Sequence, residues 1–234
     1  MGASSGIGNE VSRLLIERGW TVGVAARRTD RLEQLRALAP DRVFTAGIDV
    51  THDDAPALLR QLIAATGGMD LYFHVSGIGK QNPQLEEDIE SNTLKTNGLG
   101  FTRMIGEAYR YFAEKGTGHI AAISSIAGTK GMGAAPSYSA TKAFQNTYLQ
   151  SLEQQAHMRK LPIRFTDIRP GFVDTALLDN THYPLMMKPE YVAKKALQAI
   201  DHKRHICVID WRWRIITAFW RRIPRWIWRR LNIK

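Results

Sequence analysis

The chain alternates between short apolar runs and longer segments in which apolar residues recur every three or four positions. The first pattern is typical of buried strands and the second of amphipathic helices. Their strict alternation requires crossover helices between parallel strands, which predicts a doubly wound α/β sheet. Strands are expected at 21–26, 43–50, 71–75, 119–124 and 163–168, and helices from Ile7 to Gly19 and at 30–38, 55–65, 85–114 and 137–159.

A glycine-rich turn precedes the first helix and leads directly into it. Free backbone N–H groups and the positive end of a helix attract phosphate, and glycines let the backbone approach it closely. The order of turn, helix and strand is that of a dinucleotide site. We therefore expect pyrophosphate to bind at Gly2, Ser4, Ser5, Gly6, Ile7 and Gly8.

Two arginines, Arg27 and Arg28, follow the strand that ends at Ala26. In dinucleotide folds this position faces the adenosine ribose, where an acid accepts hydrogen bonds from a 2′-hydroxyl and an arginine accommodates a 2′-phosphate. The arginine pair favours NADP(H) over NAD(H). The alternative is that both residues belong to an ordinary solvated loop.

The segment from Ile123 to Lys142 carries the candidate proton-transfer chemistry. Tyr138 and Lys142 are four residues apart on an expected helix, so their side chains share one face. The ammonium is expected to lower the phenol pKa, which suits a general acid or base. Ser125 ends an expected strand, where its hydroxyl would reach a substrate oxygen beside the phenol. Taken alone, Tyr-x-x-x-Lys also fits two surface neighbours.

The length of 234 residues and the 44% hydrophobic content fit a single domain with a sizeable core. We place that domain at 1–210 and a separate tail at 211–234. One cysteine, Cys207, excludes an intrachain disulfide and suggests a reducing compartment. Because no run of eighteen apolar residues occurs, we expect a cytoplasmic protein that is at most peripheral on the inner face of a membrane.

Almost all of the net charge lies in the C-terminal segment. Ten lysines and arginines and one acid occur from His202 to Lys234, which gives +9 of the total +10. Five of the six tryptophans also lie in 211–234, where Pro224 should divide two short helices. This composition favours an anionic membrane surface, with a subunit contact as the alternative. The nearly neutral remainder argues against nucleic acid, and we expect none.

Several separated motifs, found in this order, resemble the short-chain dehydrogenase/reductase family over about residues 1–210. The resemblance implies a Rossmann-like fold and a catalytic tetrad of Asn97, Ser125, Tyr138 and Lys142. It also implies that Ser125 polarises a carbonyl, Tyr138 passes the proton and Lys142 lowers the tyrosine pKa while binding the nicotinamide ribose. Asn97 would hold a water that links Lys142 to solvent. Further cofactor contacts are implied for Asp49, Val50, Gly77, Tyr138, Lys142, Pro170, Gly171, Val173 and Thr175.

The sequence departs from the family at two places. After the fourth strand of the family pattern, His74-Val75-Ser76-Gly77 stands where Asn-Asn-Ala-Gly is usual, and His74 is more simply explained as a core histidine than as a substitute for the asparagine. The glycine turn begins at Gly2, so the central first strand is absent from the printed sequence. We expect further residues upstream of Met1 to supply this strand, and without it cofactor affinity should be poor unless another segment fills the position.

Two further groups of residues contribute less to the functional prediction. His205, Cys207 and Asp210 lie along an apparent last strand, and with His202 they are not expected to bind a metal. The segment 176–188 would cover the substrate, and its apolar side chains suggest an apolar one. These side chains are Leu177, Leu178, Tyr183, Leu185, Met186 and Met187.

Together these features predict an NADP(H)-dependent oxidoreductase that transfers a hydride between nicotinamide and a carbonyl or alcohol of an apolar, lipid-like substrate. By the resemblance, it would form a homo-oligomer, either a dimer or a tetramer. The alternative is a non-catalytic nucleotide-binding or scaffold protein at the membrane surface. The four tetrad residues argue against this alternative, whereas the departures at His74 and at the first strand favour it.

Overall fold

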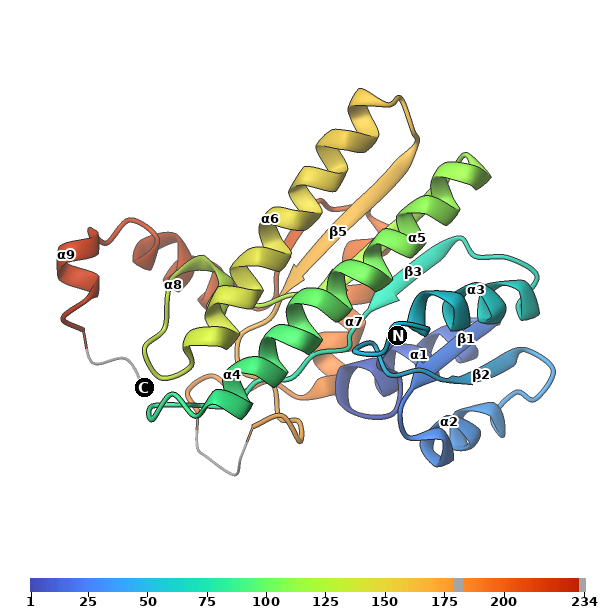
Figure 1. Cartoon of the computed structure of the whole chain (residues 1–234), viewed down its shortest axis with the longest axis horizontal. Coiled ribbons are helices and arrows are strands. Elements are labelled where there is room, and N and C mark those ends of the chain that lie inside the picture. The colour runs from blue at the N-terminus through green and yellow to red at the C-terminus, as the bar shows by residue number, and fades with distance from the viewer. Residues whose placement is uncertain (179–182, 232–234) are drawn as a thin grey trace.

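The protein is described by a computed structural model that covers residues 1–178 and 183–231. All paired strands are parallel, and helices cover both faces of the sheet (Figure 1). This confirms the predicted single-domain, Rossmann-like doubly wound fold. The strands are β1 (Val22–Ala26), β2 (Val43–Gly47), β3 (Leu71–His74), β4 (Gly118–Ile123), β5 (Ile163–Arg169) and β6 (Ile206–Val208).

The connecting helices run close to the predicted ranges, with three additions, which are η1, η2 and α7. The predicted helix at 85–114 contains a π-helical turn, η1, between α4 and α5, and the sequence analysis did not anticipate α7. The helices are α1 (Gly6–Glu17), α2 (Thr29–Arg36), α3 (Ala55–Ala65), α4 (Glu87–Leu94), η1 (Lys95–Gly100), α5 (Phe101–Lys115), the 3₁₀ turn η2 (Ile126–Thr129), α6 (Pro136–Met158), α7 (Pro189–Asp201), α8 (Trp211–Trp220) and α9 (Arg225–Trp228).

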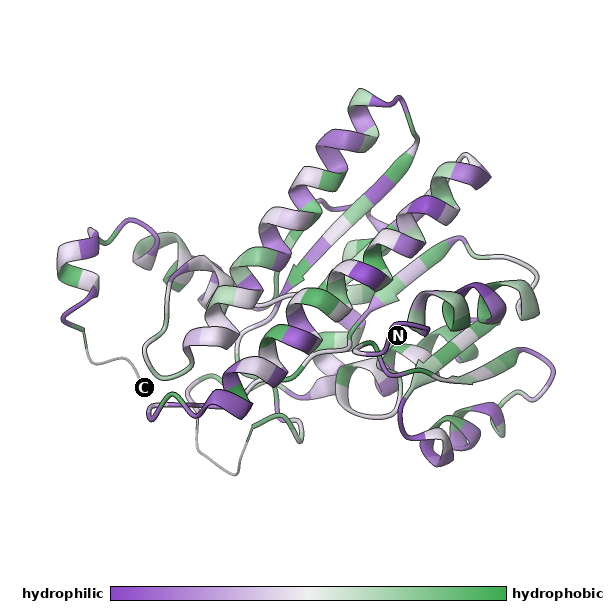
Figure 2. Cartoon of the chain, in the orientation of Figure 1, coloured by the Kyte–Doolittle hydropathy of each residue, from purple (hydrophilic) through white to green (hydrophobic). Residues whose placement is uncertain are grey.

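The core forms two apolar layers, one on each face of the sheet. Alternation along β4 shows the division, because Ala121 and Ile123 face one layer whereas Ile120 and Ala122 face the other. Helices α1 and α7 contribute to the first layer, and α3, α5 and α6 to the second. The strands are mainly apolar and the outward faces of α2, α5 and α6 are mainly hydrophilic (Figure 2). Burial from both sides explains the nearly continuous apolar runs in the sequence.

The strands fall into two hydrogen-bonded groups, β2-β1 and β3-β4-β5-β6. Among residues 1–178 and 183–231, no strand lies between β1 and β3. Met1 and Gly2 join the groups at their carboxyl ends, because the Met1 N donates to Phe73 O at 2.9 Å and the Gly2 N donates to Ala25 O at 2.7 Å. A cavity of about 630 Å³ occupies the remaining space between α1, β1 and β3.

The C-terminal segment forms helices α8 and α9, separated at Pro224 as the sequence predicted. Both lie beyond the carboxyl ends of the strands (Figure 1). Asp210 caps α8 by accepting a hydrogen bond from the Arg212 N at 2.9 Å. Trp213 is buried in the apolar layer that α1 and α7 share. Among the described residues, no helix combines the length and apolar character needed to cross a membrane.

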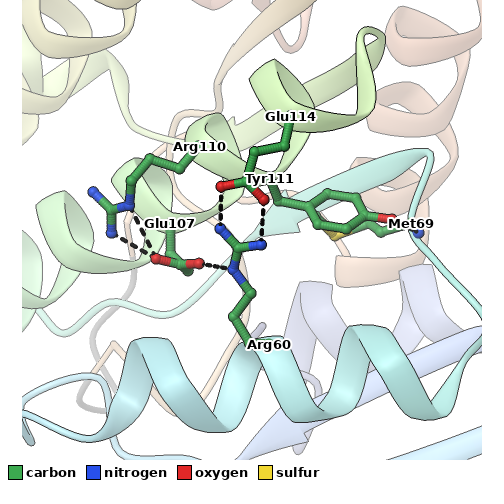
Figure 3. A network of polar contacts seen from close by, with 6 residues as sticks. All are labelled: Arg60, Met69, Glu107, Arg110, Tyr111 and Glu114. Carbon is green, nitrogen blue, oxygen red and sulfur yellow. Dashed lines mark hydrogen bonds and ion pairs between the residues drawn. The ribbon is translucent and has the colours of Figure 1, made fainter.

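A network of charged side chains fastens α3 to α5 on the outer face of the second layer (Figure 3). Glu107 is buried and accepts hydrogen bonds from Arg60 and from the Arg110 Nη2 at 2.6 Å. Arg60 also forms a bidentate pair with Glu114, at 2.7 and 2.9 Å. Because Glu107 is buried between two cations, its carboxylate should matter more to stability than that of Glu114.

We predict that Glu107→Ala lowers the free energy of unfolding by about 2 kcal/mol, because it leaves two guanidinium groups without their buried acceptor. Urea unfolding followed by circular dichroism measures the change. Glu114→Ala is the matched control, since it removes a largely exposed partner of the same arginine and should change little. Equal losses in the two variants would contradict this account of the network.

Candidate active site

The predicted site residues converge on the carboxyl edge of the sheet, although they come from distant parts of the chain. Ser125 follows β4, Pro170 follows β5, and Tyr138 and Lys142 lie in the first two turns of α6. The glycine turn precedes α1 at the same edge. Parallel strands place the loops after their carboxyl ends side by side, which is where ligands bind in such folds.

The glycine turn adopts a backbone that a side chain would obstruct. Gly2 has a φ of +88°, and a Cβ there would lie 2.6 Å from the Ser76 N. A Cβ at Gly8 would lie 2.1 Å from the Gly2 O, so the turn folds tightly against the start of α1. Ser5 is the N-cap of α1 but forms no side-chain capping bond, and the side chain of Ile7 packs in the core. The N-terminal N–H groups thus suit a pyrophosphate.

The two arginines after β1 point to different partners. The Arg28 Nη2 donates hydrogen bonds to the Ser4 Oγ at 3.1 Å and to the Ser5 Oγ at 2.7 Å. Arg27 lies 3.9 Å from the Asp49 carboxylate. Burial raises the pKa of Asp49, but hydrogen bonds from Thr51 and the charge of Arg27 outweigh it, so the net pKa shift is downward. Asp49 is therefore an ionised acceptor beside the turn.

The Tyr138 ring is half-buried and packs against the loop that follows β3. A Cβ at Gly79 would lie 2.6 Å from the tyrosine ring, so a glycine is required there. Burial raises the pKa of the Tyr138 phenol, and a hydrogen bond with Ser125 opposes this shift. The expectation that Lys142 lowers this pKa is wrong for the described arrangement. The Lys142 Nζ lies 5.7 Å from the centre of the tyrosine ring and donates its hydrogen bonds to other acceptors.

Lys142 is itself fully enclosed, and burial lowers its pKa from 10.5 to about 8 despite the nearby charge of Asp167. Its Nζ donates to the Ile123 O and to the Gln145 Oε1, both at 3.1 Å. The Gln145 Nε2 in turn donates to the main-chain O of Asn97 at 2.9 Å. Gln145 thus connects Lys142 to Asn97 by direct hydrogen bonds. The family resemblance implies a water held by Asn97 near Lys142.

Asn97 lies in the π-helical turn and is completely buried. Its side chain accepts a hydrogen bond from the Ile78 N at 2.9 Å and donates one to the Ile78 O at 2.7 Å. These bonds hold the loop that contains Gly77, where a Cβ would lie 3.3 Å from the Asn97 Oδ1 and 3.6 Å from the Lys142 Nζ. A π-turn directs the carbonyl of residue 97 toward Gln145, a use typical of functional sites.

Two further buried groups lie behind the site, of which Asp167 was not singled out in the sequence and His74 was expected to be a core histidine. Asp167 forms an ion pair with Arg169 at 2.6 Å and accepts a hydrogen bond from Ser124. His74 is completely buried, its Nδ1 lies 3.0 Å from the Tyr72 hydroxyl, and burial lowers its pKa to about 3. A neutral histidine packed edge-on against Phe101 supports the interpretation of His74 as a core residue.

The segment after β5 is held between the site and the tail. The Pro170 O accepts a hydrogen bond from the Ile126 N at 3.1 Å, and a Cβ at Gly171 would lie 2.3 Å from the Trp213 Nε1. Val173 is buried and forms a bridge with Met187. The Thr175 methyl packs on Gly6 of the glycine turn, and Val50 packs beneath Gly100 of η1. Through Thr175, the segment after β5 thus lies against the glycine turn.

A cavity of about 430 Å³ lies between α4 and the segment after β5, and its lining residue Gly79 packs against the Tyr138 ring. The segment expected to cover the substrate contributes Ala176 and Leu177 to its lining. Tyr183, from the same segment, stacks on Phe172 with ring centres 4.3 Å apart. Residues 179–182 lie outside the described part of the chain. The cavity is lined by Ile78, Gly79, Lys80, Ile89, Asn92, Thr93, Ala176 and Leu177.

Comparison with known proteins agrees with this geometry. The family described as short chain dehydrogenase matches residues 1–184. An uncharacterised oxidoreductase of Mycobacterium tuberculosis is 30% identical over 236 residues, which cover 96% of this chain and 92% of that protein. An oxidoreductase of Myxococcus xanthus is 33% identical over 194 residues, which cover 79% of this chain and 74% of that protein.

Solved structures show the same fold at lower sequence identity. An alcohol dehydrogenase from Thermococcus sibiricus, complexed with 5-hydroxy-NADP, superposes with a TM-score of 0.77 at 23% identity, over 89% of this chain and 92% of that chain. A 3-ketoacyl-(acyl-carrier-protein) reductase from Brucella melitensis, complexed with NADH, gives a TM-score of 0.79 at 19% identity, over 89% of this chain and 94% of that chain. At these identities the likeness establishes the fold alone.

Fold and site together define a dinucleotide-dependent oxidoreductase. The chain belongs to the short-chain dehydrogenase family and is an NAD(P)-dependent enzyme of that family.

The burial of Lys142 predicts a specific dependence of stability on pH. Between pH 8 and 10.5 the amine is protonated in the unfolded chain but largely neutral in the folded one, so the free energy of unfolding rises with pH in this window. Lys142→Met removes this titration. The free energy of unfolding of the unmodified protein should rise by about 3 kcal/mol more than that of the variant between pH 8 and pH 10.5.

Chemical denaturation at a series of pH values measures both proteins under identical conditions. Lys195→Met, which removes an exposed lysine of α7, is the control for a general effect of losing a lysine. Parallel stability curves for Lys142→Met and the unmodified protein would show that burial does not shift the Lys142 pKa.

Proposed function

We propose that the protein is an NADP(H)-preferring carbonyl reductase or alcohol dehydrogenase in which Tyr138 exchanges the proton with an apolar substrate. The observation that carries the proposal is that Ser125, after β4, acts on the Tyr138 phenol of α6, whose ring packs on Gly79 in the wall of a cavity of about 430 Å³. A phenol whose pKa is raised by burial is protonated at neutral pH. It is therefore in the form that a reductase needs, because the alcohol product requires a proton from its acid.

The bound dinucleotide supplies the hydride for the carbonyl carbon, and the chain supplies orientation and the proton. Ser125 donates a hydrogen bond to the carbonyl oxygen, and Tyr138 gives its hydroxyl proton to the same oxygen as negative charge develops there. Lys142 would hold the cofactor ribose, and solvent would return the proton to the tyrosinate that remains. Gln145 and Asn97 position the Lys142 ammonium.

The preference for NADP(H) is supported by Arg28. Its guanidinium contacts both serines of the glycine turn and has no acidic partner among the described residues, so it is available for a 2′-phosphate. Arg27 has a different surrounding, because Asp49 lies 3.9 Å away. Arg28 is therefore the stronger candidate of the two for the 2′-phosphate.

The substrate class and the assembly are also proposals. Leu177 in the cavity wall and the apolar segment around it support an apolar, lipid-like carbonyl or alcohol. A homo-oligomer, either a dimer or a tetramer, is supported by Leu99 of η1 and Phe144 of α6, which are both exposed on neighbouring elements. We further propose a cytoplasmic protein that binds no nucleic acid and contacts an anionic membrane surface through its basic tail.

Tyr138→Phe tests the proposed acid directly. Removing the hydroxyl should lower kcat/KM by about a thousandfold, whereas NADPH affinity should change little because the ring is retained. NADPH oxidation across a panel of apolar ketones and aldehydes measures turnover, and quenching of protein fluorescence measures binding. Tyr148→Phe on the same helix is the control. Retained turnover would remove Tyr138 from the mechanism, and NADPH binding by a wild-type protein inactive on every carbonyl would favour the scaffold alternative.

Arg28→Ala tests the cofactor preference. Loss of a charge-assisted contact should raise the Kd for NADPH between tenfold and a hundredfold, as expected for about 1.5–3 kcal/mol, while leaving the Kd for NADH nearly unchanged. Isothermal titration with each cofactor measures both constants. Arg36→Ala, at the far end of α2, is the matched control. An equal loss of affinity for both cofactors would place Arg28 at the pyrophosphate they share.

A further inference from the structure

Helix α8 has two apolar faces, and only one of them packs on the protein. Trp213, Thr217 and Trp220 face inward, and the first two are buried. On the opposite side, Trp211, Ile215 and Phe219 recur every four residues and form one outer stripe. Their exposed fractions are 65%, 48% and 73%. Three large apolar side chains this exposed on one helical face mark a binding surface, since single exposed residues would be scattered.

Arginines surround the outer stripe. Arg212 pairs with Asp210, but Arg214, Arg221 and Arg222 form no ion pair within the described residues. The same holds for Arg225, Arg229 and Arg230 around α9, where Trp226 is also exposed. Residues 211–234 contain no acid. The tail therefore presents apolar side chains within a band of positive charge.

An anionic lipid surface matches this combination better than other partners. A nucleic acid would engage the arginines but leave Ile215 and Phe219 in water. A two-fold contact between two copies would bring like charges together, because each copy presents the same arginines. At a bilayer, aromatic rings lie at headgroup depth and guanidinium groups bind lipid phosphates, so both features are satisfied at once.

The inner side of the tail is fastened to the loop between Ser125 and Tyr138. The Trp220 Nε1 donates to the Thr129 Oγ1 at 2.7 Å, and the Trp228 Nε1 donates to the Gly131 O at 2.8 Å. The Lys130 Nζ donates to the Ile223 O at 2.8 Å. Because these bonds tie both tail helices to one active-site loop, a surface bound by the tail has a fixed position relative to the site.

Trp213 makes a second connection, to the segment that borders the substrate cavity. Its ring packs against Gly171 and lies edge-on to Phe172, with ring centres 5.5 Å apart. Phe172 in turn stacks on Tyr183. The tail therefore supports both loops that flank the site, at the end of the molecule where α8 and α9 lie (Figure 1).

We propose that the outer stripe and arginines of α8 and α9 dock on an anionic lipid bilayer and hold the active site beside it. The substrate would then be an apolar carbonyl or alcohol that enters from the lipid, and this second part rests on the proposed function. The docking itself depends only on the tail.

Vesicle flotation of the full chain tests the docking. Vesicles of phosphatidylcholine alone are compared with vesicles of equal parts phosphatidylcholine and phosphatidylglycerol. The protein should float with the anionic vesicles and lose binding as salt is raised. The triple variant Trp211→Ser, Ile215→Ser, Phe219→Ser should reduce the bound fraction about tenfold or more. Arg221→Gln with Arg222→Gln should weaken binding to a similar degree.

Matched controls separate the tail from general surface changes. Leu38→Ser with Met158→Ser removes exposed apolar side chains elsewhere, and Arg31→Gln with Arg36→Gln removes charge from α2. Both should float like the unmodified protein. Reduction of a water-soluble ketone should persist in the triple variant, so loss of docking is distinguished from failure of the proposed reductase activity.

Three results would overturn the proposal. The first is unchanged flotation of the triple variant. The second is a protein that never floats but whose mass, measured by light scattering, falls to that of a monomer in the triple variant, which would assign the stripe to a subunit contact. The third is binding to a nucleic-acid duplex in preference to anionic vesicles, with the same arginines required.

Discussion

The arrangement of the site depends on the burial of one ammonium group. A charged amine without water must have hydrogen-bond acceptors on several sides, and Lys142 finds them in the Ile123 carbonyl at the end of β4 and in Gln145 one turn along α6. Gln145 is held in turn by the Asn97 carbonyl, which the π-turn between α4 and α5 makes available. The ends of β4, α6 and η1 are therefore fixed relative to one another by a single side chain. The burial that lowers the Lys142 pKa to about 8 also raises the pKa of Tyr138, so the two pKa values move apart and burial favours the neutral form of each group.

Much of the fold could be predicted from the sequence, because a buried parallel sheet has a strong pattern. The predicted strands at 71–75 and 119–124 differ from β3 and β4 by one residue at their ends. The π-turn at Asn97 could not be predicted, since it inserts one residue into a helix whose apolar spacing remains nearly regular. Helix α7 was missed although Val192, Ala196 and Ala199 have helical spacing. Within the described residues, the two groups of strands are connected by Met1, which bonds to Phe73, and by Gly2 and Ala3, which bond to Ala25.

The candidate site was easier to locate than to describe in chemical detail. Spacing alone placed Tyr138 and Lys142 on one face of a helix, and the loops after β4 and β5 brought Ser125 and Pro170 beside them. The direction of the tyrosine pKa was predicted wrongly because the sequence shows which charges are neighbours but not how much water is excluded. Gln145 was missed for a related reason. A glutamine in a helix has no distinguishing pattern, although its position three residues after a buried lysine placed it within reach.

The tail changes how the active site should be understood. Gly171 has no room for a side chain because Trp213 fills the space above it, and Thr129 uses its hydroxyl to hold Trp220. The loops on both sides of Tyr138 therefore depend on residues that lie after the sheet is complete. Burying a tryptophan orders a large side chain and requires a hydrogen-bond partner for its N–H. A tail that only kept the protein in solution would not need such contacts. The Nε1 of Trp213 has no partner in the described structure, so packing alone holds this ring against the substrate segment. A partner bound at the outer face of α8 would act on these same contacts, so the proposed docking surface is connected to the active site through Trp213 and Trp220.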